Sequence, residues 1–222
     1  MVQTELAYDK FQIKFNENFE NSKVSVDRGR FVLIMNEAQN KFIENILDRK
    51  SNDEIRYLQK ILVKDLKITR TATRENADYF KLPDNYFDFS SAYSKASTKS
   101  CNNQKIFLYE IKDDNAVQVL QDEYQKPSFF AREAPFIFSS DNFVIYKEDF
   151  TNDELYLSYY RYPQQIRLLD PENPESLFDP NYNLEFDEKT VDRIISMAVA
   201  EMKINDENQS FQINKQQAIN KF

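Results

Sequence analysis

The chain of 222 residues contains a single glycine, Gly29, and this scarcity limits the sites that the chain can build. Motifs that cradle phosphate groups or wrap a calcium ion need glycine at fixed positions, where the backbone must turn sharply or approach a ligand closely. The sequence therefore excludes a Walker A loop, a dinucleotide-binding fingerprint and an EF-hand loop.

The chain also has no histidine and only one cysteine, Cys101. Without histidine, Ser-His-Asp and Cys-His catalysis and histidine-ligated zinc or haem are excluded. A single cysteine forms no disulfide within the chain and no multi-thiolate metal site. We therefore predict that the protein is not an enzyme and that it holds no metal and no cofactor.

Aromatic residues supply much of the apolar surface, with 19 phenylalanines and 13 tyrosines but no tryptophan. Burial of these rings is sufficient to build a core, which makes a disordered chain implausible. No apolar stretch approaches the length of a membrane span, so no membrane partner is expected.

Two neighbouring segments near the N-terminus show the apolar spacing of amphipathic helices. Residues 30–49 carry apolar side chains at steps of three and four. Residues 51–66 carry a second apolar stripe, formed by Ile55, Leu58, Ile61 and Leu62. The two segments predict an antiparallel helix pair. Residues 1–24 precede the pair, and the alternation of Phe11, Ile13 and Phe15 within them favours a short strand or an extended arm.

A third helix is expected to begin near Asp187. Asp187 can cap it, and Phe186 and Val191 have the spacing of a hydrophobic staple around that cap. An apolar stripe runs from Val191 to Met202. Because each helical stripe is one-sided, we expect the helices of residues 30–66 and 187–204 to pack together.

The segment between the helices has a different character, since residues 79–186 hold 23 of the 32 aromatic residues. Residues 104–112 alternate with period two, residues 136–138 and 143–146 form a hairpin signal around a Ser-Ser-Asp-Asn turn, and residues 155–162 are β-prone. Residues 117–124 predict one short helix between them. The segment predicts four to six strands in an antiparallel sheet or a small barrel.

The expected fold is thus α+β with three parts. Residues 1–66 form an N-terminal arm and helix pair, residues 67–186 form the β-rich domain, and residues 187–222 form a C-terminal helix and tail packed on the N-terminal helices.

An enzymatic alternative depends on Asp84, Glu110 and Lys112, which loosely match the Pro-Asp…Glu-x-Lys pattern of metal-dependent nucleases. The two carboxylates could hold Mg²⁺ and the lysine could orient a water molecule. An exposed pair of opposite charges on a strand gives the same Glu-x-Lys pattern. We favour this structural interpretation over a nuclease site.

Several runs of the sequence resemble the head-to-tail connector proteins of short-tailed phages. These are RF at residues 30–31 with NEAQNKFI at residues 36–43, and KLPD at residues 81–84. YYRYPQQI at residues 159–166, DRII at residues 192–195 and NQ at residues 208–209 are similar to the ring proteins of crAss-like phages.

This resemblance implies a non-enzymatic structural subunit of a ring, commonly a dodecamer, that extends the DNA channel below the portal and links capsid to tail. It implies as partners further copies of the chain, the portal protein and other ring or tail proteins, and packaged DNA that passes through without sequence-specific binding. The expected location is the head-to-tail junction of the virion, after synthesis in the host cytoplasm. The alternative is a soluble assembly, scaffolding or host-interaction module.

Aromatic residues on the β segment and at the C-terminus are the candidates for subunit contacts: Phe107, Tyr109, Tyr159, Tyr160, Tyr162 and Phe222. Residues 67–186 carry 20 acidic and 13 basic residues, which accounts for nearly all of the net charge of −8. An acidic channel wall would let DNA slide, because each basic contact would be an anchor for a phosphate. The candidates for this wall are acids at predicted strand ends: Asp113, Asp114, Asp141, Glu148 and Asp149.

Overall fold

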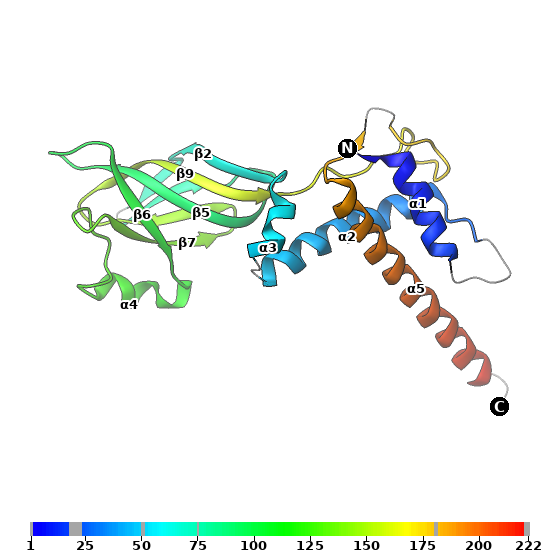
Figure 1. The fold of residues 1–222 in the computed structure, drawn as a ribbon. Helices are drawn as coiled ribbons and strands as arrows, with labels where there is room; N and C mark the ends of the chain where they lie inside the picture. Colours follow the sequence, from blue (N-terminus) through cyan, green and yellow to red (C-terminus); the bar gives the residue numbers. More distant parts are fainter. Residues whose placement is uncertain (1, 18–23, 50–51, 75, 180–181, 220–222) are drawn as a thin grey trace. The chain divides into compact units, whose positions relative to one another are not determined.

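The computed structural model describes residues 2–17, 24–49, 52–74, 76–179 and 182–219, and in residues 52, 113 and 204–219 it describes the backbone alone. The chain divides into a helical unit, Met1–Lys60 with Pro163–Phe222, and a sheet unit, Ile61–Tyr162. Both units are drawn in Figure 1. The α+β fold class is confirmed. Within the described ranges, no helix is long and apolar enough to cross a membrane.

Helices α1 (Thr4–Asn16), α2 (Arg28–Arg49) and α5 (Glu188–Ile219) form the helical unit. A two-residue pairing of β1 (Val2–Gln3) with β10 (Asn183–Leu184) joins its two chain segments. Lys41 on α2 lies 3.2 Å from Glu201 on α5, and the ring of Phe42 packs edge-on against Phe186. These contacts hold α5, and the residue Phe186 that precedes it, against α2.

Residues 4–16 form a helix, and the expected strand or extended arm is wrong. Ala7, Phe11 and Phe15 follow one another at four-residue steps and are all buried, while Ile13 is exposed. The alternation of Phe11, Ile13 and Phe15 therefore reflects two buried rings on one helix face with an exposed residue between them.

The predicted second helix of residues 51–66 is also much shorter than expected. Helix α3 covers Asn52–Ile55, a 3₁₀ turn, η1, covers Arg56–Leu58, and β2 begins at Leu62. Leu62–Thr69 pairs with β9 (Thr151–Arg161), a strand that lies far away in sequence. Long-range pairing outweighs local helical spacing here, and it places residues 61–66 in the sheet unit.

The connector, residues 163–182, belongs to the helical unit and not to the β-rich part expected from the sequence. It packs closely against the start of α2, where the Gly29 amide donates to the Pro174 carbonyl at 2.8 Å. A Cβ atom at Gly29 would lie 3.1 Å from Cβ of Pro174, which is tighter than ordinary van der Waals contact. The only glycine of the chain thus stands where a side chain would crowd the connector.

Asp187 caps α5 as predicted. Its Oδ1 accepts a hydrogen bond from the Thr190 amide at 2.8 Å, and Phe186 and Val191 are both buried on either side of the cap. The hydrogen bond from the Thr190 amide holds the pKa of Asp187 below its ordinary value.

Replacing Asp187 with alanine is expected to lower the free energy of unfolding by about 0.5–2 kcal/mol, because the amides at the start of α5 lose their acceptor. The lowered pKa makes the carboxylate's contribution complete above the unfolded pKa of about 3.9, and the contribution disappears as pH falls through the folded value. Urea unfolding between about pH 3 and pH 7 covers the range in which this contribution is lost. The variant Asp187→Asn provides a cap that does not titrate. Equal pH profiles for the wild type and Asp187→Asn would contradict the assignment.

The sheet unit has one eight-stranded sheet in the order β2-β9-β5-β6-β7-β8-β4-β3. Its other strands are β3 (Ala72–Arg74), β4 (Ala77–Lys81), β5 (Tyr86–Ser97), β6 (Gln104–Glu110), β7 (Glu133–Ser139) and β8 (Asn142–Tyr146), and all neighbours are antiparallel except β6 and β7. Helix α4 (Ala116–Gln121) is the predicted short helix, and it lies in the connection from β6 to β7. The sequence predicts the strands after residue 104 and misses β2 to β5.

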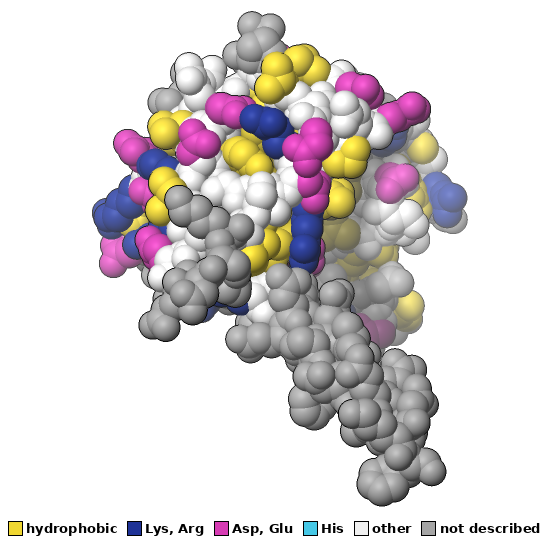
Figure 2. Space-filling model, turned by 90° about the vertical axis from the view of Figure 1, so that its right-hand side faces the viewer, with side chains coloured by type: hydrophobic (Ala, Val, Ile, Leu, Met, Phe, Trp, Pro, Cys, Tyr) yellow, Lys and Arg dark blue, Asp and Glu magenta, His cyan; other side chains and the backbone are white. Residues whose placement is uncertain are grey.

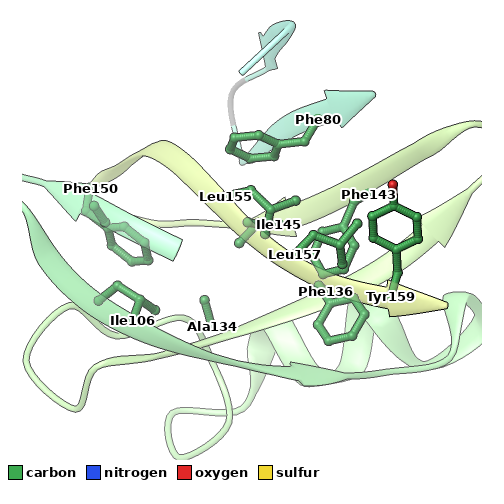
Figure 3. Packing of buried hydrophobic residues seen from close by; sticks show 11 residues of the cluster. Phe80, Ile106, Ala134, Phe136, Phe143, Ile145, Phe150, Leu155, Leu157 and Tyr159 are labelled. Atoms are coloured by element: carbon green, nitrogen blue, oxygen red, sulfur yellow. The ribbon is translucent and has the colours of Figure 1, made fainter. Parts of the chain in front are cut away.

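Turns without glycine are made by other residues with positive φ, as Ser140 shows between β7 and β8. The core inside the curled sheet is built from aromatic and branched side chains of several strands, among them Phe80, Phe136, Phe143 and Leu157 (Figure 3). The rings of Phe136 and Phe143 stack with centroids 4.3 Å apart. Much of the aromatic content of this segment is therefore used for internal packing.

Candidate functional site

The most exposed aromatic side chains of the sheet unit lie in the segment that leads from α4 into β7. Phe130 is 95% exposed and Tyr124 is 98% exposed. Leaving a phenylalanine in water forgoes the free energy of burial, which is about 1.5–3 kcal/mol for such a side chain. Rings in this position are typical of protein-protein contacts.

The turn that carries Phe130 is fixed by its own hydrogen bonds. The amides and carbonyls of Ser128 and Glu133 bond each other at 2.8 and 3.1 Å, and the Ser128 hydroxyl accepts from the Ala131 amide at 3.1 Å. The neighbouring ring of Phe129 packs inward against Phe150 with centroids 6.0 Å apart. Phe130 is thus presented outward from an ordered turn, a form of preorganisation that favours binding.

A second group of rings forms a ladder across the outer face of β9, β5 and β6. Tyr156 and Tyr93 stack with centroids 4.8 Å apart, and Tyr93 is paired in register with Phe107. The Lys105 ammonium lies 4.0 Å from the Tyr93 ring centroid and 5.5 Å from that of Phe107. Phe107, at the end of this ladder, is 56% exposed.

Glu154 balances the lysines near this ladder. Lys67 Nζ lies 2.5 Å from Glu154 Oε1, and the Tyr156 hydroxyl donates to Glu154 Oε2 at 2.7 Å. The hydrogen bond from Lys67, and then that from Tyr156, lower the pKa of Glu154. The carboxylate is therefore ionised at neutral pH and offsets the positive charge on this face.

The six predicted interface residues fall into different environments. Phe107 and Tyr162 are exposed, and Tyr162 packs edge-on against Phe87 with centroids 4.7 Å apart. Tyr109 is half-buried, its hydroxyl donates to the Gln125 carbonyl, and burial raises its pKa. Phe222 lies outside the described residues.

Tyr159 and Tyr160 are buried inside the sheet unit, in place of the interface position expected from the sequence. The Tyr159 hydroxyl donates to Asn85 Oδ1 at 2.9 Å, and its ring stacks on Tyr86. Alternating aromatic residues on β9 are thus accounted for by packing within one chain. Exposed Phe130 has only a weak signal in the sequence, the doubled Phe129-Phe130 after a Pro-Ser turn.

The predicted channel acids do not gather at one end of the sheet. Asp141 precedes β8 and Glu148 and Asp149 follow it, so they stand at opposite ends of that strand, and all three are exposed. Asp114 is exposed in the turn η2 (Asp113–Asn115), and the side chain of Asp113 is not described. A wall formed by these acids would have to run along β8.

The charge balance changes when it is counted over the observed unit. Ile61–Tyr162 carries 16 acidic and 13 basic residues, while residues 163–186 carry five acidic residues and one basic residue. Much of the acidic excess therefore belongs to residues 163–186, which lie between the sheet unit and α5 in sequence. On the face shown in Figure 2, acidic and basic side chains are interspersed with hydrophobic ones.

The three nuclease candidates are not assembled into one site. Asp84 is almost fully exposed and lies 3.4 Å from Lys81, in a depression with Tyr86 and Asp141. Glu110 and Lys112 line a different depression, together with Ile137. Among the residues that the structure describes, no group of three acidic or cysteine side chains is arranged to hold a metal ion.

A buried polar cluster that the sequence did not reveal lies between β4 and β9. Asp78 Oδ1 lies 2.7 Å from Lys147 Nζ, and Asp78 Oδ2 accepts from the Asn152 amide at 2.8 Å. Thr73 donates its hydroxyl hydrogen to Asp78, and Ser94 donates to Asn152 Oδ1 at 2.7 Å. Four strands separate β4 from β9 in the sheet order, so these bonds hold the curl of the sheet.

Two surface depressions lie among the described residues of the helical unit. One is a groove of about 630 Å³ between α2 and the connector, lined by Val32, Leu33, Ile166 and Leu168 with Arg30 and Arg167 among its polar residues. The other, of about 780 Å³, lies between α2 and α5 and is lined by side chains of both charges, including Arg49, Glu54 and Asp192. The first groove is the more apolar surface.

Comparison with known proteins adds no assignment to this geometry: no protein-family model matches the chain, and no curated protein matches it.

Proposed function

We propose that the protein is a structural subunit of a head-to-tail connector ring of a short-tailed phage, which extends the DNA channel and links capsid to tail. The observation that carries the proposal is the presence of separate apolar contact surfaces on each unit of one chain. Phe130 and Tyr124 are fully exposed on the sheet unit, and Leu33 is 72% exposed beside a groove of the helical unit. A ring subunit needs two different surfaces for its two neighbours.

The resemblance supplies the rest of the proposal, namely a dodecameric ring, contacts with the portal and tail proteins, and the passage of DNA. The exposed acids at both ends of β8 support a channel wall that does not grip phosphate groups. In this role the protein works without catalysis, and its location is the virion.

Electron microscopy of the purified full-length protein, together with a DNA-binding titration at several salt concentrations, tests the proposal. We expect closed rings with a central opening, and only weak binding of duplex DNA without sequence preference. Monomers that bind neither DNA nor each other would instead favour a soluble assembly or host-interaction module. Mg²⁺-dependent cleavage of DNA that is lost in Asp84→Ala would favour the nuclease.

A further inference from the structure

We propose that Phe130 of one copy inserts into the groove between α2 and the connector of a second copy, and that this contact joins neighbouring subunits. The inference rests on the proposed function, because it names the contact by which a ring of these subunits would form. The occupant of the groove is thus a second copy of this chain.

The shape and chemistry of the groove fit an aromatic side chain. Its apolar lining comes from Val32 and Leu33 on α2 and from Ile166, Leu168 and Pro171 of the connector, and its volume is about 630 Å³. An aromatic side chain buries about 150–250 Å² when it is enclosed.

Both partners of the contact are ordered before they meet. The Phe130 turn is closed by the hydrogen bonds between Ser128 and Glu133. The connector wall is closed by the bridge between Leu168 and Phe178 and by the bond from the Leu169 amide to the Leu177 carbonyl at 2.9 Å. Little conformational entropy is then lost on association, which favours a hot-spot contact centred on Phe130.

Charged residues flank both surfaces, and Arg30 and Arg167 line the groove itself. Arg132 lies two residues after Phe130 in the same turn. It is exposed and has a positive φ of 63°. Residues 163–186 carry five acidic residues and one basic residue, and the exposed acids Asp170 and Glu172 stand on either side of Pro171, which lines the groove. An arginine that follows the ring would meet this acidic rim, which steers the approach and fixes its orientation.

Phe130 and the groove are different surfaces of the same chain, one on the sheet unit and one on the helical unit. In a ring, each copy would offer Phe130 to one neighbour and its groove to the other, and the circle closes when every Phe130 is seated.

Cysteine pairing between copies tests the contact directly. In a Cys101→Ser background, which removes the exposed native thiol, the variants Phe130→Cys and Leu33→Cys are purified separately and then mixed under oxidising conditions. We expect a disulfide-linked dimer in the mixture and none in either variant alone. Val117→Cys, which is 65% exposed on α4 of the same unit, is the matched control and should not pair with Leu33→Cys.

Three outcomes of the cysteine experiment would overturn the proposal. They are a Phe130→Cys homodimer as abundant as the mixed dimer, no disulfide-linked dimer in the mixture, and a disulfide within single chains of a variant that carries both Phe130→Cys and Leu33→Cys.

Substitutions without cysteine give a second readout. Phe130→Ser should weaken self-association about 30-fold, while Val117→Ser leaves it unchanged. Arg132→Glu should also weaken self-association, and Glu172→Arg should restore part of the loss.

If the wild type forms rings and Phe130→Ser forms them equally well, this contact is wrong and the proposed function stands. If the contact forms but the product is a filament, the proposed function fails and the contact stands.

Discussion

Replacing Asp78 with alanine is expected to lower the free energy of unfolding of the sheet unit by about 3–5 kcal/mol, the cost of breaking a buried ion pair by removing one partner. Asp78 is fully buried and accepts hydrogen bonds from Lys147, Thr73 and the Asn152 amide. Without its carboxylate, the Lys147 ammonium would be left buried and without its counter-charge. The substitution should therefore open the sheet where β4 meets β9.

The matched control is Glu148→Ala, one residue after Lys147. Glu148 is exposed, and its pairing with Lys126 at 3.3 Å is a surface contact that contributes about 0–1 kcal/mol. A double variant with Asp78→Leu and Lys147→Met should regain part of the lost stability, because it removes both charges together. Urea unfolding followed by tyrosine fluorescence measures all three. A loss below about 1 kcal/mol for Asp78→Ala would show that the cluster does not hold the sheet.

Phe31→Ala should destabilise the helical unit by a similar amount, about 3–5 kcal/mol, through the lost burial and the cavity that remains. Phe31 is fully buried on α2, and its ring makes edge contacts with Tyr8, Phe11 and Phe178 at centroid distances of 5.2, 5.3 and 5.6 Å. These three residues come from α1 and from the connector. The substitution should thus loosen both segments from α2.

Leu33→Ala, two residues further along the same helix, is the matched control. Leu33 is 72% exposed, so its truncation should change the free energy of unfolding by no more than about 0.5 kcal/mol. Hydrogen exchange would localise the effect of Phe31→Ala, since amides of α1 and of residues 163–179 should exchange faster than in the wild type. Unchanged exchange in these segments would contradict the account of the core.

The parts of the fold that the sequence predicts are those whose signal is local. The Asp187 cap, its hydrophobic staple and the hairpin around Ser140 each depend on residues within a few positions of one another. Residues 62–66 are predicted to continue a helix, but they belong to a strand whose partner, β9, lies about ninety residues away in sequence. Local spacing carries no information about such a pairing.

The candidate site shows the same division. Tyr159 and Phe107 both lie in segments that the sequence predicts as strands. The curl of the sheet decides that Tyr159 is buried and Phe107 is exposed. Asp78 precedes Tyr79 and Phe80 in the sequence, and two of its buried partners, Lys147 and Asn152, follow about seventy residues later in the chain. The exposure of Phe130 likewise depends on a turn closed by Ser128 and Glu133.

Native mass measurement of the wild-type protein over a range of concentrations tests the central claim that this chain is a ring subunit. The account predicts one dominant assembly, whose mass is a fixed integer multiple of the 26.5 kDa chain, with few intermediates because a closed ring satisfies every contact. A population of monomers at all concentrations, or an open series of sizes without a preferred number of subunits, would contradict it.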